Sequence, residues 1–137
     1  MKITVITVSY NSATTIADTV RSVASQTYKN IEHLVIDGQS RDKTSLVVQA
    51  NHHPNLIFSS EPDGGIYDAM NKGLMKVTGD LVVFLNADDW YASADIFSSV
   101  AIKYIKDLDY IYGNLSFVSR FTNKIIRNWH AQHDNSC

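Results

Sequence analysis

Short runs of β-branched and apolar residues alternate with segments of helical periodicity, and this alternation is the feature that most constrains the fold. The apolar runs at residues 3–8, 34–36, 56–58 and 81–85 predict four strands. The run at 81–85 contains no polar residue, which is typical of a strand buried on both faces of a parallel sheet. The run at 56–58 is short, and we expect it at an edge of the sheet.

Apolar residues recur at helical spacing between these runs and predict four helices. Their inward-facing residues are, in chain order, Ile16, Val20 and Val23; Leu46 and Val47; Ile66, Met70, Leu74 and Val77; and Ile96, Val100 and Tyr104. Ser12 or Thr14 would cap the first helix and Asp42 the second. Gly79 would end the third, and the fourth would span residues 94–106. Strand and helix alternating four times favour an α/β fold with a mostly parallel sheet flanked by helices.

The last part of the chain has a different pattern. Residues 110–119 and 124–129 predict two further extended segments joined near Asn123, and the polar residues 131–137 are expected to fray. A length of 137 residues predicts a single domain. The single cysteine, Cys137, excludes an internal disulfide and a cysteine-based zinc site, which fits a reducing compartment.

The composition narrows the range of partners. Twelve Lys and Arg residues against 14 Asp and Glu residues give a net charge of −2, so we expect no nucleic acid partner. No run of about 18 apolar residues occurs, and the first residues are interpreted as a strand rather than as a secretory signal. Neither G-x-G-x-x-G nor a P-loop motif occurs, which disfavours a dinucleotide-dependent dehydrogenase and a P-loop enzyme.

Segments that carry acids, amides and hydroxyls follow all four predicted strands. They are Ser9, Tyr10, Asn11 and Ser12; Asp37, Gly38, Gln39 and Ser40; Glu61, Pro62, Asp63 and Gly64; and Asn86, Ala87, Asp88, Asp89 and Trp90. Because ligands of open parallel sheets bind outside the carboxyl ends of the strands, we expect these residues to converge.

Two of these positions suggest specific chemistry. Asp88 and Asp89 are adjacent carboxylates that suit Mg²⁺ or Mn²⁺, although such a pair also caps turns and helices. Asp37 stands where an acid accepts hydrogen bonds from a ribose or a base, and an Asx-turn is the alternative interpretation.

Four motifs, in order and spacing, resemble the family 2 glycosyltransferases: residues 10–11, 37–44, 68–73 and 84–89. The stretch 61–73, together with residues 79–80 and 85–89, is most similar to bacterial enzymes that assemble colanic acid and related polysaccharides. The resemblance covers about residues 1–115. It implies a GT-A fold, with residues 1–115 as the donor-binding half and 116–137 as a tail or the start of a shortened acceptor half.

The resemblance also implies a site. The implied nucleotide-sugar-binding residues are Tyr10, Asn11, Asp37, Asp63, Gly64, Asn71, Asn86 and Asp88, and the implied metal ligands are Asp88 and Asp89. Tyr10 would lie near the base and Asp37 would contact the uracil or ribose. Asn71 would help to hold the helix and loop beside the diphosphate, and Asp63 and Gly64 would line the sugar side. The acidic pair would hold Mn²⁺ or Mg²⁺ on the donor diphosphate.

The sequence departs from the family pattern at three positions within these motifs. Gly38 replaces a second acid, Asn86 replaces the first acid of the metal motif, and Met70 replaces a common arginine. Inverting members take their catalytic base from the later half of the chain. No residue after the segment 110–114, which resembles the strand region behind the metal motif, matches such a base, so none is assigned.

The implied reaction is transfer of a hexose from a nucleoside diphosphate sugar, UDP-sugar favoured, to a glycan or lipid-linked acceptor, with inversion. Two alternatives stay open: a nucleotide-sugar-binding fragment without turnover, and a sugar-phosphate nucleotidyltransferase. The implied location is the cytoplasm, with peripheral association at the inner face of the cell membrane as a hypothesis. The open end of a short sheet is a reason to expect a homodimer.

Overall fold

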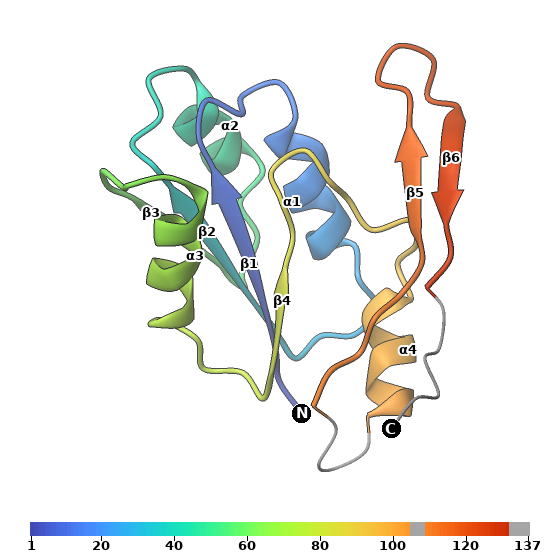
Figure 1. Ribbon diagram of the computed structural model, residues 1–137. Helices are drawn as coiled ribbons and strands as arrows, with labels where there is room; N and C mark the ends of the chain where they lie inside the picture. Colours follow the sequence, from blue (N-terminus) through green and yellow to red (C-terminus); the bar gives the residue numbers. More distant parts are fainter. Residues whose placement is uncertain (105–108, 132–137) are drawn as a thin grey trace. The chain divides into compact units, whose positions relative to one another are not determined.

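A computed structural model describes residues 1–104 and 109–131 (Figure 1). The chain divides into two compact units, Met1–Lys103 and Tyr104–Cys137, and each is described by itself. Within the described residues, none of the helices has the length and apolar character needed to cross a membrane.

The first unit contains a four-stranded sheet of β1 (Ile3–Ser9), β2 (Ile31–Asp37), β3 (Leu56–Ser60) and β4 (Leu81–Phe84). The strand order is β3-β2-β1-β4, and all three pairings are parallel. The predicted α/β fold with a mostly parallel sheet is therefore confirmed, and β3 lies at an edge as expected. The chain moves from β1 to β3 in one direction and returns to place β4 beside β1, so the topology switches between β1 and β4.

Four helices, α1 (Ile16–Ala24), α2 (Thr44–Ala50), α3 (Ile66–Leu74) and α4 (Ile96–Lys103), accompany the sheet (Figure 1). Side chains alternate between the faces of a strand, so the core has two sides. On one side, Val35 of β2 packs with Ile16 and Val20 of α1 and Val48 of α2. On the other side, Ile36 of β2 packs with Ala69 of α3.

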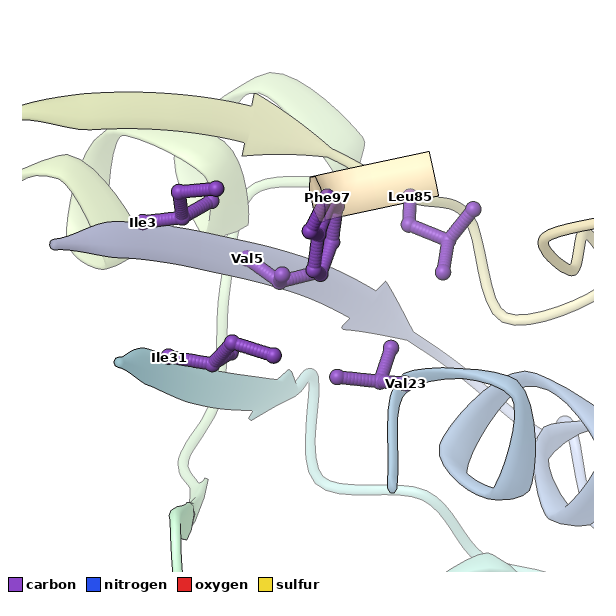
Figure 2. Packing of buried hydrophobic residues seen from close by; sticks show 6 residues of the cluster. All are labelled: Ile3, Val5, Val23, Ile31, Leu85 and Phe97. Atoms are coloured by element: carbon purple, nitrogen blue, oxygen red, sulfur yellow. The ribbon is translucent and has the colours of Figure 1, made fainter. Parts of the chain in front are cut away.

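A third cluster fixes α4 to the same side of the sheet as α1 (Figure 2). Its buried members come from β1, α1, β2, the end of β4 and α4, and they are Ile3, Val5, Val23, Ile31, Leu85 and Phe97. This packing sets the direction in which the chain leaves β4, where the acidic pair of residues 88–89 follows.

Three predicted core positions are wrong. In α2 Val48 is buried and the predicted Val47 packs against the same cluster, whereas Leu46 is 62% exposed. In α3 the buried residues are Ala69 and Gly73, whereas Ile66 and Leu74 are half exposed. The physical reason in α3 is its close approach to β1 and β2: Ala69 and Gly73 face the sheet, whereas Ile66 and Leu74 lie to the sides.

The prediction that β4 is buried on both faces is also wrong. Leu81 and Val83 pack into the cluster beneath α4, whereas Val82 is 36% and Phe84 is 42% exposed. Because α3 packs against β1 and β2, the second face of β4 is covered only in part among the described residues. The helix α3 also ends at Leu74, five residues before the Gly79 stop that the sequence suggested.

The second unit contains an antiparallel pair, β5 (Leu115–Val118) and β6 (Ile125–Trp129). Both fall inside the predicted extended segments, and β5 is shorter than predicted. The register shifts between Phe117 and Val118, and the Arg127 guanidinium lies 5.9 Å from the centre of the Phe117 ring. The predicted end of the fourth helix, Lys106, and the only cysteine, Cys137, lie outside the described residues.

Candidate functional site

The loops after the strands of the parallel sheet leave it at the same edge, toward which β1 points in Figure 1. The strand register places Ser9, Asp37 and Ser60 side by side at the ends of β1, β2 and β3. A ligand crevice is expected at this edge, where the topology switches between β1 and β4. All predicted site residues except Asn71, which is exposed on α3, lie in these loops or at a strand end.

The carboxylate of Asp37 is buried and receives four hydrogen bonds from the chain itself. Its Oδ1 accepts from the hydroxyls of Ser9 (3.0 Å) and Ser40 (2.5 Å). Its Oδ2 accepts from the backbone N–H of Ser40 (2.9 Å) and the hydroxyl of Ser60 (2.7 Å). Asp37 therefore ties the ends of three strands together, and Ser60 is a partner that the sequence analysis did not single out.

The loops after β1 and β2 are fastened to each other by side chains. Asn11, which has a positive φ of 50°, donates its backbone N–H to Ser40 Oγ (2.8 Å). Its own amide oxygen accepts the backbone N–H of Arg41 (2.9 Å). Asn tolerates this left-handed conformation better than most residues do, which explains an asparagine at the turn.

Asp42 continues this fastening. Its carboxylate accepts the backbone N–H groups of Thr44 (2.9 Å) and of Ala13 (3.1 Å). The hydrogen bond from the Thr44 hydroxyl is the main cause that holds the pKa of Asp42 below its usual value. Asp42 was predicted to be the N-cap of α2, but the N-cap is Lys43 and Asp42 is the residue before it. Its carboxylate still accepts the backbone N–H of Thr44, the first residue of the helix.

The loop between β3 and α3 lies against the end of β2. A Cβ atom on Gly38 would lie 2.5 Å from Oδ2 of Asp63, so the Asp63 carboxylate fills the space beside this glycine. Oδ1 of Asp63 accepts the backbone N–H of Gly65 (2.9 Å). The backbone N–H of Gly64 is donated to Asp68 (2.9 Å), which lowers the pKa of that carboxyl.

The acidic pair follows β4 in a turn. The backbone N–H of Asp89 is donated to the carbonyl of Asn86 (3.1 Å), and the Asn86 amide is donated to Asp89 Oδ2 (3.4 Å). Partial burial and the neighbouring charge of Asp88 raise the pKa of Asp89, and the Asn86 amide opposes this in part. Two adjacent carboxylates are hard oxygen ligands and suit a hard divalent cation.

The described residues contain no group of three or more His, Cys, Asp or Glu side chains arranged to hold a metal ion. A cation at Asp88 and Asp89 would therefore complete its shell with water or ligand oxygens, which is how Mg²⁺ is usually bound. The donor set fits a divalent cation that is shared with an anionic ligand.

A family model described as "Glycosyl transferase family 2" matches residues 4–135. The chain belongs to this family. The resemblance of the four motifs is thereby confirmed at the level of the family.

The relatives of this chain carry glycosyltransferase names. An uncharacterized glycosyltransferase of Mycobacterium tuberculosis, Rv1514c, is 41% identical over 95 residues, which cover 69% of this chain and 36% of the relative. The Escherichia coli protein "UDP-Glc:alpha-D-GlcNAc-diphosphoundecaprenol beta-1,3-glucosyltransferase WfgD" is 28% identical, with coverage of 85% and 47%. The chain thus spans less than half of the length of either curated relative.

Solved structures confirm the GT-A class of fold. Staphylococcus aureus TarS 1–349 in complex with UDP-GlcNAc matches with a TM-score of 0.69 and 29% identity, covering 74% of this chain and 30% of TarS. The mannosyltransferase PcManGT from Pyrobaculum calidifontis, in complex with GDP-Man and Mn²⁺, matches with a TM-score of 0.70 and 31% identity. That match covers 87% of this chain and 36% of PcManGT.

Proposed function

We propose that this chain forms the donor-binding half of a metal-dependent, inverting glycosyltransferase. The donor is a nucleoside diphosphate hexose, UDP-sugar favoured, and the acceptor is a glycan or lipid-linked saccharide of polysaccharide assembly. The observation that carries the proposal is the acidic pair Asp88–Asp89 after β4, beside the topological switch of a family 2 sheet. WfgD is named as an enzyme with a UDP-Glc donor and a diphosphoundecaprenol-linked acceptor, and the TarS and PcManGT structures hold UDP-GlcNAc and GDP-Man, which supports a nucleoside diphosphate sugar as donor.

The acidic pair would hold Mn²⁺ or Mg²⁺ on the donor diphosphate. When bound, the cation supplies Lewis-acid stabilisation of the leaving nucleoside diphosphate. Asn86 donates its amide to Asp89, and we propose that it also bonds a ribose hydroxyl of the donor. Asn71, exposed on α3, is proposed to support the loop beside the diphosphate.

The base would lie near the loops after β1 and β2. Tyr10 follows β1 and is 58% exposed, so its ring is free to stack on a base. Asn11 and Asp37 hold the two loops in place through the hydrogen bonds described above. A direct contact of Asp37 with the uracil or ribose stays a prediction, as does lining of the sugar side by Asp63 and Gly64.

Titration calorimetry of UDP and of GDP, with and without Mn²⁺, tests the donor site. We expect binding that needs Mn²⁺ and that is lost in an Asp88→Asn plus Asp89→Asn variant with an unchanged circular dichroism spectrum. Asp18→Asn is a matched control, because Asp18 is an exposed acid of α1 paired with Arg21 (2.6 Å). Binding of neither nucleotide, or equal binding by the acidic-pair variant, would contradict the proposal.

A second candidate function is nucleotide-sugar binding without turnover, since no residue of the given sequence is assigned as a catalytic base. Radiolabelled UDP-glucose and a polyprenyl diphosphate-linked acceptor distinguish the two. A labelled acceptor indicates transfer, whereas metal-dependent binding without a labelled acceptor supports the donor-binding half alone.

A further inference from the structure

We propose that Asp63 selects the nucleobase of the donor, and that Gly38 is the residue that makes room for it. Asp63 would accept a hydrogen bond from the ring N–H of a uracil or guanine base. This inference rests on the proposed function, because it concerns the base-binding end of the same site. It revises two roles expected from the family resemblance: Asp63 moves from the sugar side to the base, and Asp37 from the base to the positioning of the loops.

The first step concerns Asp37, whose acceptor positions are already used by hydrogen bonds within the chain. A carboxylate has about four acceptor positions. The Asp37 carboxylate receives four hydrogen bonds from Ser9, Ser40 and Ser60, and the residue is 1% exposed. Asp37 therefore has little capacity left to accept a hydrogen bond from a base, and its contacts assign it to positioning of the loops.

The second step concerns Asp63, whose carboxylate can still accept a further hydrogen bond. Asp63 is half-buried, and its Oδ1 accepts one hydrogen bond, from the backbone N–H of Gly65. Among the described residues, no donor is recorded for its Oδ2, and no Lys or Arg forms an ion pair with Asp63. The neighbouring cation, Lys72, lies instead 3.4 Å from Asp68 and 3.9 Å from Glu61.

The third step concerns the place of that oxygen. Oδ2 of Asp63 lies 2.5 Å from the position of a Cβ on Gly38, the residue that directly follows Asp37 at the end of β2. The backbone N–H of Gly38 is donated to the Ser9 carbonyl (2.9 Å), so Gly38 also adjoins the start of the Tyr10 loop. A side chain at position 38 and a carboxylate from position 63 thus compete for one space at the proposed base site. In this chain the loop between β3 and α3 supplies the acid.

The chemistry of the bases then predicts a preference. Uracil at N3 and guanine at N1 present an N–H donor, whereas cytosine at N3 and adenine at N1 present an acceptor. A carboxylate at this place favours the first pair and repels the lone pair of the second. Asp63→Asn keeps an oxygen for Gly65 and turns an amide NH₂ group toward the base, so it is expected to reverse the preference.

Calorimetry with UDP, CDP and N3-methyl-UDP in the presence of Mn²⁺ tests the assignment. The unmodified chain is expected to bind UDP at least about tenfold more tightly than CDP or N3-methyl-UDP, as befits one charge-assisted hydrogen bond. In Asp63→Asn, the affinity for UDP falls and that for CDP rises, so the ratio approaches or passes unity. Gly38→Ala moves the Asp63 carboxylate away and is expected to reduce the same ratio while the fold is kept.

Glu61→Gln is the matched control, because Glu61 is an exposed acid of the same loop that pairs with Lys72. It is expected to leave the ratio unchanged. Equal loss of UDP and N3-methyl-UDP binding in Asp63→Asn would overturn the assignment, since Asp63 would then act on the ribose or on loop shape. In that outcome metal-dependent UDP binding by the unmodified chain still stands, whereas binding of no nucleotide removes the proposed function as well.

Discussion

Gly73 of α3 lies directly against Ile6 of β1. A Cβ atom on Gly73 would lie 2.6 Å from Ile6 Cγ2 and 3.4 Å from Ile36 Cγ1, and both isoleucines are buried. This contact explains why α3 turns its small residues to the sheet, and it fixes the helix that follows the loop carrying Asp63.

Replacing Gly73 by Ala is expected to lower the free energy of unfolding by about 1–2 kcal/mol. Overpacking a core costs roughly 1–3 kcal/mol, and the higher helix propensity of Ala offsets up to about 1 kcal/mol of this. Urea unfolding followed by circular dichroism measures the change. Gly113→Ala is the control, because a Cβ there would meet no atom within 4 Å. A Gly73→Ala variant as stable as the unmodified chain would argue against the close approach of α3.

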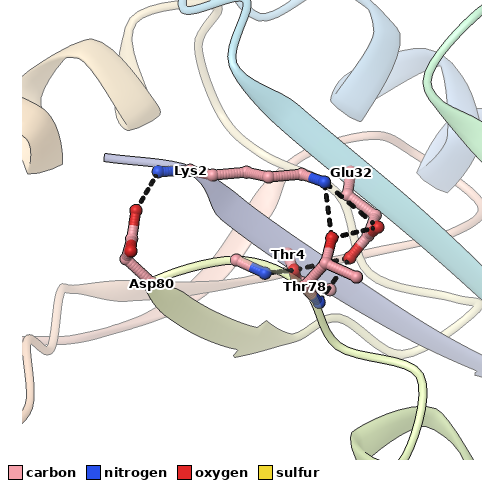
Figure 3. A network of polar contacts seen from close by, with 6 residues as sticks. Lys2, Thr4, Glu32, Thr78 and Asp80 are labelled. Carbon is pink, nitrogen blue, oxygen red and sulfur yellow. Dashed lines mark hydrogen bonds and ion pairs between the residues drawn. The ribbon is translucent and has the colours of Figure 1, made fainter.

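The carboxylate of Glu32 is the centre of a buried polar network at the opposite end of the sheet (Figure 3). It accepts hydrogen bonds from the hydroxyls of Thr4 (2.8 Å) and Thr78 (2.7 Å) and from Lys2 Nζ (3.2 Å). Burial alone would raise the pKa of Glu32, but the hydrogen bonds from Thr78, Thr4 and Lys2 outweigh it and lower the pKa. Glu32 thereby joins the starts of β1 and β2 to the segment before β4.

Glu32→Gln is expected to lower the free energy of unfolding by about 1–3 kcal/mol, because an amide nitrogen replaces one of the two accepting oxygens. Chemical denaturation of this variant beside Glu61→Gln, an exposed acid, measures the effect. If both variants unfold at the same urea concentration, the network around Glu32 does not stabilise the fold.

The order of strands and helices was predictable because local patterning already determines it. The strand cores at 3–8 and 34–36 are uncharged and β-branched, and both lie in observed strands. The buried faces of the helices were less predictable, because they depend on how closely a helix approaches the sheet. Ile66 and Leu74 fit a helical stripe, but the contact of Gly73 with Ile6 rotates them away from the core.

The candidate site was predictable as a set of polar strand ends, because parallel strands bring their carboxyl ends to one edge. Which residues contact each other inside the site was not predictable. Ser60 bonds Asp37 only because the register of β2 and β3 places them side by side, and the contact of Gly38 with Asp63 joins two loops that are distant in sequence. Neither relationship leaves a spacing signal in a single sequence.

Asp37→Ala is expected to destabilise the chain by about 1–3 kcal/mol, and Asp37→Asn by less. The alanine variant leaves three serines without their shared acceptor, and of these Ser9 is buried; an unsatisfied buried group costs roughly 1–3 kcal/mol. Asparagine keeps one oxygen for the Ser40 N–H, and the serine hydroxyls can rotate to accept from its NH₂ group. Thermal and urea unfolding rank the two variants, and the reverse order would contradict the hydrogen bonding described here.

The stability of the chain is expected to fall as the pH falls below about 6.5. His33 is fully buried, bonds Thr7 Oγ1 through Nε2 (3.0 Å), and lies with Nδ1 3.2 Å from Nε2 of His53. Burial first, and the charge of His53 second, lower the pKa of His33 to about 3. Between its ordinary pKa of 6.5 and 3, the unfolded chain binds a proton that the folded chain does not, so acid favours unfolding.

This linkage amounts to about 1.4 kcal/mol per pH unit for one group, or about 2 kcal/mol between pH 7.5 and pH 5. Urea unfolding at the two pH values measures it. His33→Gln keeps a donor and acceptor for Thr7 but does not titrate, so its stability should change much less over the same range. His52→Gln, at an exposed position of the loop before β3, should retain the full dependence. An unmodified chain equally stable at both pH values would show that His33 is protonated as easily in the folded state as in the unfolded chain, which its buried contacts with Thr7 and His53 oppose.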